Sequence, residues 1–111
     1  MAKGRVSLHA LGRFMASIRV MQPHRLTLGE ARSRIERAAA LAAAKYRLVW
    51  RWVDGVLEVF PPPGVAVGAR GRLRLLDGAA QAEVELPGPY RFVQARVASR
   101  LARELDDLLA C

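Results

Sequence analysis

Residues 48–60 read LVWRWVDGVLEVF, and this stretch decides the fold. Asp54-Gly55 lies at its centre, and Asp-Gly supplies the positive φ angles that a two-residue hairpin turn needs. Pairing residues outward from the turn at period two predicts two antiparallel strands. An Arg51–Glu58 pair lies on one face. The opposite face is apolar and carries Leu48, Trp50, Trp52, Leu57 and Val59.

A second stretch, residues 70–86, repeats the pattern around Asp77-Gly78 with the sequence RGRLRLLDGAAQAEVEL. The predicted partners on its charged face are Arg70 with Glu85, Arg72 with Glu83, and Arg74 with Gln81. Its apolar face carries Leu73, Leu75, Ala80, Ala82, Val84 and Leu86. One apolar and one charged face are typical of an antiparallel sheet that helices cover on one side only.

Two helices and one more strand complete the expected architecture. Residues 18–21 form a short strand, and Thr27 and Glu30 make a capping box that starts a helix rich in alanine. From Tyr90 an amphipathic helix places Val93, Val97, Leu101, Leu105 and Leu108 on one face. The sequence therefore predicts an α+β fold in the order β-α-β-β-β-β-α, an antiparallel sheet with two helices packed on one face.

The length of 111 residues predicts one domain, which we place at residues 15–111 because Met15 reads like a chain start leading into a strand. For residues 1–14 we expect a disordered, dispensable basic extension. Two alternatives remain open: an upstream extension from a different start codon, or a short amphipathic helix. That helix would use Val6, Leu8, Leu11 and Phe14.

The formal net charge is +8, and 16 of the 18 basic residues are arginine. Such a surface attracts nucleic acid, anionic lipid or an acidic protein, although arginine-rich usage also follows from genomic base composition, and we favour the latter reading. Cys111 is the single cysteine, so no disulfide within the chain is possible. With no apolar stretch long enough for a membrane span or a signal peptide, we expect a cytoplasmic protein.

Neither histidine has a partner at a metal-ligand spacing, and Cys111 has no ordered base beside it. The sequence therefore predicts no metal site, no cofactor and no enzymatic activity. His24 precedes a helix and could contact an anion there, but a solvated loop histidine is the favoured interpretation. Trp50 and Trp52 could stack on bases, yet their alternation with Leu48 favours packing in the core.

The outer face of the predicted sheet holds two candidate sites. An apolar strip would form an interface, either with a partner or by face or edge pairing into a homodimer, and consists of Val49, Val53, Val56 and Phe60. A second group could contact an anion and consists of Arg70, Arg72, Arg74 and His24. Because Glu83 and Glu85 lie opposite the arginines and compete for them, a self-neutralised face is the favoured interpretation.

Over residues 17–109 the chain resembles the small polyhydroxyalkanoic acid system proteins, which are encoded beside polyhydroxyalkanoate synthesis genes. The resemblance rests on Pro23-His24-Arg25-Leu26 with Ala31, Lys45-Tyr46 before Trp50-Arg51-Trp52, Gly68 with Gly71, and the closing leucine-rich helix. It departs from the family around Pro87-Gly88-Pro89-Tyr90. The resemblance implies a non-enzymatic accessory protein of the storage-granule system, at the granule surface or with granule proteins.

Two functions from other classes stay open. The net charge suggests a basic nucleic-acid-binding module, whose signature would be a steep salt dependence of DNA binding. The space between sheet and helices suggests a small-ligand-binding domain, although convergent polar residues are missing from the inward face.

Overall fold

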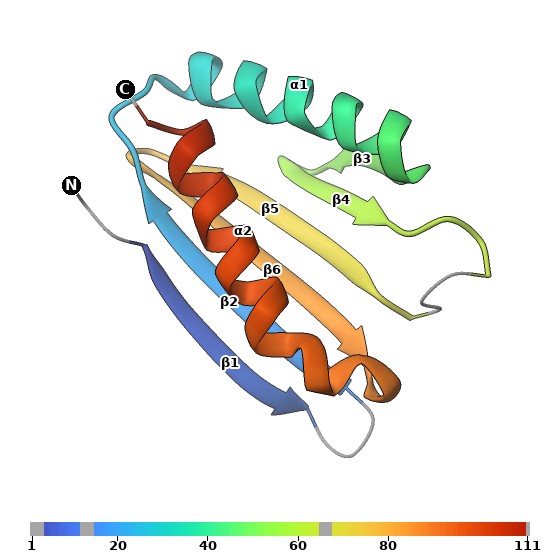
Figure 1. Cartoon of the computed structure of the whole chain (residues 1–111). Helices are drawn as coiled ribbons and strands as arrows, with labels where there is room; N and C mark the ends of the chain where they lie inside the picture. Colours follow the sequence, from blue (N-terminus) through green and yellow to red (C-terminus); the bar gives the residue numbers. More distant parts are fainter. Residues whose placement is uncertain (1–3, 12–14, 65–67, 111) are drawn as a thin grey trace.

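The computed structural model describes residues 4–11, 15–64 and 68–110. Within these residues six strands form one antiparallel sheet in the order β1-β2-β6-β5-β4-β3. The strands are β1 (Arg5–Leu11), β2 (Met15–Pro23), β3 (Val49–Val53), β4 (Val56–Phe60), β5 (Arg70–Leu76) and β6 (Ala79–Pro87). The helices are α1 (Leu28–Tyr46), the short 3-10 helix η1 (Gly88–Val93) and α2 (Gln94–Leu108). Both long helices lie on the same face of the sheet, so the predicted α+β class is confirmed (Figure 1).

Both hairpins have the predicted register. Val53 lies opposite Val56 in the first, and Leu76 lies opposite Ala79 in the second. Asp54 and Gly55 have φ angles of 50° and 78°, as a two-residue turn of that type requires. In the second turn only Gly78, with φ of 80°, has a positive angle, so the expectation of two positive angles was wrong there.

Residues 5–11 differ from the sequence-based expectation. They form strand β1, which pairs with β2 from Arg5 opposite Met21 to Leu11 opposite Met15. Neither a disordered extension nor an amphipathic helix describes this segment. The alternation of Val6 and Leu8 fits the two-residue period of a strand. Pairing with β2 favours this period over the 3.6-residue period of a helix. Residues 1–3 and 12–14 lie outside the described part, and the domain boundary at Met15 stays a prediction.

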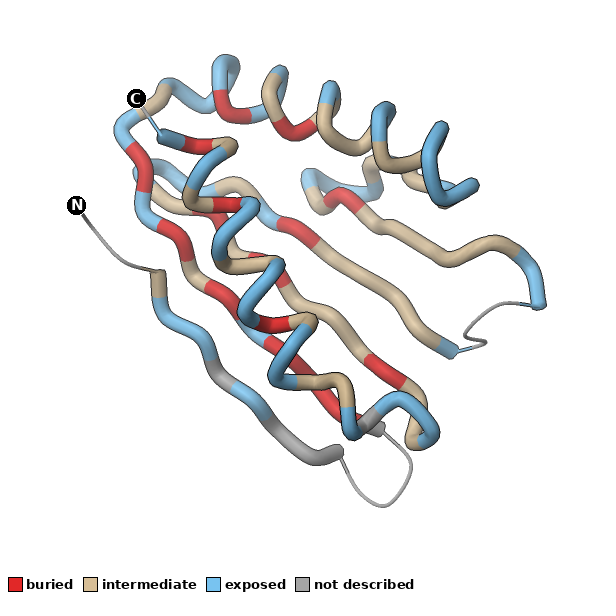
Figure 2. Tube along the Cα trace, viewed as in Figure 1, coloured by how far each residue is buried: buried red, intermediate tan, exposed pale blue. Residues whose placement is uncertain are grey.

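The core is centred on β2, below α2. Ala16, Ile18 and Val20 have no exposed surface, and Ala98 and Leu105 of α2 are buried with them. Figure 2 shows the buried residues concentrated along β2, β6 and the sheet-facing side of α2. A strand predicted to be four residues long is therefore nine residues long and lies inside the sheet, between β1 and β6.

Helix α1 begins as predicted. The Thr27 hydroxyl accepts a hydrogen bond from the Glu30 backbone N–H at 3.1 Å. In this helix the buried residues are Ala31 and Ile35, both in its first half. The second half lies over the sheet with only partly buried alanines facing it (Figure 2).

Helix α2 begins later than predicted, at Gln94 instead of Tyr90. Val93 is its N-cap and has no side-chain hydrogen bond to the helix backbone. No capping side chain therefore defines an earlier start of the α-helix. The 3-10 turns of η1 lead the chain from β6 into the helix instead.

Candidate functional site

The face of the sheet opposite the helices carries a row of alternating charges across five strands. Direct partners in the row are Arg51 with Glu58, Glu58 with Arg72, Arg72 with Glu83, and Glu83 with Arg19. At the two ends Arg19 binds Glu83 with an N–O distance of 3.0 Å, and Arg51 binds Glu58 at 3.3 Å. Each glutamate thus forms its ion pair with the arginine at the end of the row, on the side away from Arg72.

Arg72 lies in the middle of this row and has no ion pair among the described residues. Its Nε atom is buried and has no hydrogen-bond partner. Glu58 and Glu83, its neighbours on either side, are already bound by Arg51 and Arg19. The row therefore holds three guanidinium groups against two carboxylates, and the surplus positive charge sits at its centre.

The two other predicted anion-contact arginines on β5 behave differently from each other. Arg70 donates to both carboxylate oxygens of Glu85, at 3.1 and 3.4 Å, as predicted for a self-neutralising pair. Arg74 lies opposite Gln81, is exposed, and makes no ion pair within the described chain.

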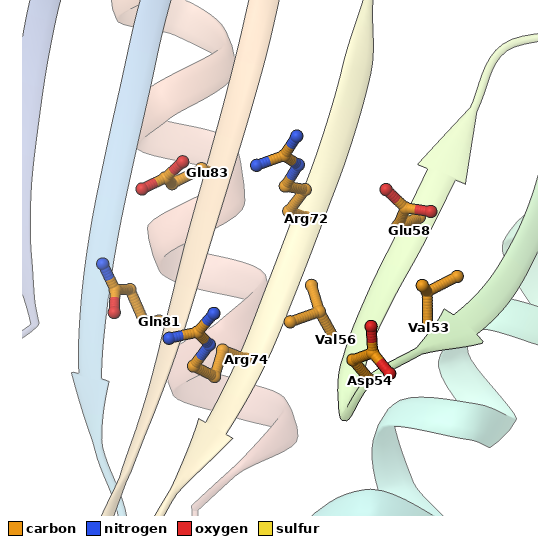
Figure 3. Close-up of a pocket in the computed structure, with 8 residues that line it drawn as sticks. All are labelled: Val53, Asp54, Val56, Glu58, Arg72, Arg74, Gln81 and Glu83. Carbon is orange, nitrogen blue, oxygen red and sulfur yellow. The ribbon is translucent and has the colours of Figure 1, made fainter.

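Arg72 and Arg74 share a shallow hollow of about 320 Å³ with residues from three neighbouring strands (Figure 3). The sticks show Glu58 and Glu83 on the strands flanking Arg72. The other lining residues are Val53, Asp54, Val56 and Gln81. The hollow thus joins members of both groups of candidate residues, the apolar strip and the arginines.

The apolar strip divides into two pairs. Val49 lies opposite Phe60 at one end of the first hairpin, and Val53 lies opposite Val56 at the other. The Arg51–Glu58 pair separates them, and the Arg51 guanidinium lies 5.5 Å from the centre of the Phe60 ring. Val49 and Val53 are 55% and 40% exposed, so the edge strand presents most of the apolar surface.

His24 is not on this face and is not a solvated loop histidine. It is buried, its Nδ1 accepts a hydrogen bond from the Leu26 N–H at 3.1 Å, and its backbone N–H donates to the Gly78 carbonyl at 2.9 Å. These bonds join the start of α1 to the β5–β6 turn. Because that turn is brought there by tertiary pairing, the burial of His24 has no local signal in the sequence.

The two tryptophans pack on the inner face, as predicted. Trp52 Nε1 donates to the Glu36 carboxylate of α1 at 3.2 Å, and the Arg32 guanidinium stacks 4.4 Å from its ring centre. Trp50 packs partly buried against the core. Glu36 and Arg32 of α1 thus cover Trp52, which does not form an open platform for bases.

One exposed aromatic residue went unnoticed in the sequence. Phe92 in η1 is 84% exposed, and its position outside the Val93, Val97 and Leu101 period was the available signal. Among the described residues no group of three or more His, Cys, Asp or Glu side chains could hold a metal ion. None of the helices in the described part is long and apolar enough to cross a membrane.

Comparison with known proteins gives one family. A family model described as "Putative polyhydroxyalkanoic acid system protein" matches residues 18–109, which is most of the chain. No curated protein and no solved structure matches the chain. The match begins within β2, runs through α2, and excludes β1.

Proposed function

The chain belongs to this polyhydroxyalkanoic acid system family, and we propose that it is a non-enzymatic accessory protein that binds the surface of the polyester storage granule. The observation that carries the proposal is the open outer face of the sheet. That face combines exposed apolar side chains at the β3 edge with arginines that exceed their glutamate partners. An ester-rich polymer surface offers apolar methylenes and carbonyl acceptors, which suit valine side chains and guanidinium donors respectively.

The residues on the outer face of the sheet support contact with an acceptor-rich surface more than contact with a polyanion. In the described strands this face carries six arginines and three glutamates: Arg5, Arg19, Arg51, Arg70, Arg72, Arg74, Glu58, Glu83 and Glu85. Because the glutamates interleave with the arginines, a nucleic-acid backbone would meet carboxylates between its contacts. This arrangement favours granule binding over the basic nucleic-acid module.

Co-sedimentation of the full chain with polyhydroxyalkanoate granules tests the proposal. The double variant Val49→Glu/Val53→Glu places charges on the exposed edge and is expected to weaken binding about tenfold or more, given the apolar area lost. Leu41→Glu is the matched control, because Leu41 is 73% exposed on α1, away from the outer face. Equal weakening by the control would contradict the proposal.

Salt separates this function from nucleic-acid binding. Granule binding driven by apolar contact is expected to persist at about 1 M salt, where charge interactions are screened within about 3 Å. Retention on DNA that disappears with salt, combined with no granule binding, would support the nucleic-acid alternative instead.

The same edge would serve homodimer formation, and we propose it as the surface that pairs if the protein is a dimer. β3 is a five-residue edge strand with two exposed valines. Light scattering of the full chain and of Val49→Glu/Val53→Glu checks this. A dimer that survives the double variant would place the interface elsewhere.

A further inference from the structure

The outer face of β5 and β6 carries an incomplete ladder of arginine–glutamate pairs. Three residue pairs follow one another on this face, and they are Arg70–Glu85, Arg72–Glu83 and Arg74–Gln81. The first pair is complete, because Arg70 donates to both carboxylate oxygens of Glu85, at 3.1 and 3.4 Å. This pair shows how an arginine of β5 binds a carboxylate that lies opposite and is available.

The other two arginines of the ladder lack such a carboxylate, for different reasons. Glu83 lies opposite Arg72 but binds Arg19 of β2 at 3.0 Å. The Arg72 Nε atom is buried and has no hydrogen-bond partner among the described residues. Arg74 lies opposite Gln81, whose amide group has the shape of a carboxylate but no charge. Two neighbouring guanidinium groups therefore remain without an anionic partner.

Arg72 and Arg74 are close enough to act on one anion. Residues two positions apart on a strand lie about 7 Å apart and point to the same face. Both line the hollow of about 320 Å³, where Arg72 extends between Glu83 and Glu58 and Arg74 extends towards Gln81 (Figure 3). The two positive charges repel each other, and an anion between them reduces that repulsion. A carboxylate suits them because guanidinium groups donate in parallel pairs to its two oxygens.

The charge around the hollow suits a ligand with a single negative charge. Three carboxylates and two guanidinium groups line it. Two of these carboxylates already bind the arginines at the ends of the charged row. The third, Asp54, lies in the β3–β4 turn, and Val56 lies between it and Arg74 in Figure 3. One positive charge therefore remains, which a monocarboxylate neutralises and a phosphate group with up to two negative charges exceeds.

Apolar side chains continue the hollow away from the arginines. Val56 of β4 lies directly opposite Arg74, and Val53 of β3 lies opposite Val56. Val53 is 40% exposed, so its methyl groups are accessible to a ligand. The distance from β5 to β3 is two strand spacings, about 10 Å. An aliphatic chain that starts at Arg74 therefore covers both valines before it passes the edge of the sheet.

We propose that this hollow binds a small aliphatic monocarboxylic acid. Its carboxylate lies at Arg72 and Arg74 and supplies the acceptor that β6 does not offer to Arg74. Its chain lies on Val56 and Val53. The proposal goes beyond the granule role, because the ligand is a dissolved molecule and the test contains no polymer.

Titration of the full chain with acetate, butyrate and hexanoate at constant ionic strength tests the proposal. NMR signals of the arginine Nε–H groups and of the valine methyl groups report where the ligand binds. Each added methylene group is expected to tighten Kd about twofold, which is half the free-energy gain of full burial, because the hollow is shallow. Hexanoate is expected to bind more tightly than 1-hexanol, which lacks the charge, and more tightly than inorganic phosphate.

Gln81→Glu is the sharpest variant, because it keeps the shape of the side chain and offers Arg74 a carboxylate from the chain itself. It is expected to weaken hexanoate binding about tenfold or more, as the loss of a charged hydrogen bond predicts. Ser99→Glu is the matched control, since it adds the same charge at an exposed position of α2, on the other side of the sheet (Figure 1).

Arg74→Gln tests the same site without adding a charge. Arg74 is exposed, so the fold is expected to tolerate the change, and hexanoate binding should weaken as much as in Gln81→Glu. Arg103→Gln, at an exposed position of α2, is its matched control. Circular dichroism and urea unfolding show whether each variant is folded.

Three results would overturn the proposal: unchanged hexanoate affinity in Gln81→Glu and Arg74→Gln, equal weakening by the two controls, or equal affinity for acetate and hexanoate. An apolar cleft of about 490 Å³ lies between α1 and α2 on the other side of the sheet, and Trp50 is among its lining residues. Hexanoate that shifts the signals of Trp50 and not those of Val56 would bind in that cleft, which would also overturn the proposal.

The proposal and the granule role can fail separately. Granule binding without hexanoate binding by the unmodified chain overturns this proposal alone. Hexanoate binding without granule binding overturns the granule role alone.

Discussion

At the scale of single residues, Arg72 is the clearest departure from simple charge pairing. The sequence predicted that Glu83 would compete for it, and the register does place them opposite each other. In the structure Arg19, which comes from β2, binds that glutamate instead. Cross-strand counting within one hairpin could not include a third strand, so the pairing of Arg72 depended on tertiary structure.

Substitution of Arg72 tests this view of the row. Arg72→Met keeps the stem and removes the charge, and we expect the free energy of unfolding to change by less than about 1 kcal/mol, because both glutamates keep their own arginines. Arg72→Glu puts a third carboxylate between two others and should cost about 1–2 kcal/mol. Urea denaturation measures both, and the cost of Arg72→Glu should shrink at high salt. A loss of unfolding free energy in Arg72→Met as large as that in Arg72→Glu would mean that the positive charge of Arg72 itself stabilises the row.

At the scale of elements, the sequence predicted the starts of helices and the turns well where a nearby side chain makes the defining hydrogen bond. Thr27 caps α1 as expected because its hydroxyl group reaches a backbone N–H three residues away. Helix α2 lacks such a residue, and its predicted start was wrong by four residues. The period of its apolar face was nevertheless correct, since Leu105 is buried against the sheet.

Removal of the α1 cap gives a direct measurement. Thr27→Ala is expected to lower the free energy of unfolding by about 1 kcal/mol, because the Glu30 N–H loses its acceptor. Ser33→Ala serves as the control, since Ser33 is exposed within the same helix and alanine has the higher helix propensity. Urea denaturation of both variants checks the prediction, and a control as unstable as Thr27→Ala would argue against the cap.

At the scale of the whole molecule, β1 decides whether β2 is an edge strand or an internal one. β2 holds three residues with no exposed surface, and β1 pairs along most of its length. The family match begins at residue 18 and omits β1, so the sequence comparison and the sheet define different domain limits.

Comparison of the full chain with residues 15–111 tests whether β1 is part of the stable domain. Loss of β1 removes a ladder of backbone hydrogen bonds and exposes a new strand edge. We expect the truncated chain to lose at least about 2 kcal/mol of stability and to self-associate. Urea unfolding and size-exclusion chromatography measure these effects. An equally stable, monomeric truncated chain would restore the sequence-based view of a dispensable extension.

The sequence by itself determined the two hairpins, their register, the apolar face and the start of α1. Each of these depends on residues close together in the chain, where turn geometry and periodicity act directly. Only the tertiary structure decided the place of β1, the Arg19–Glu83 pair, the burial of His24 and the cleft between α1 and α2. These features depend on segments far apart in the chain, and no local pattern states which strands become neighbours or how closely two helices approach.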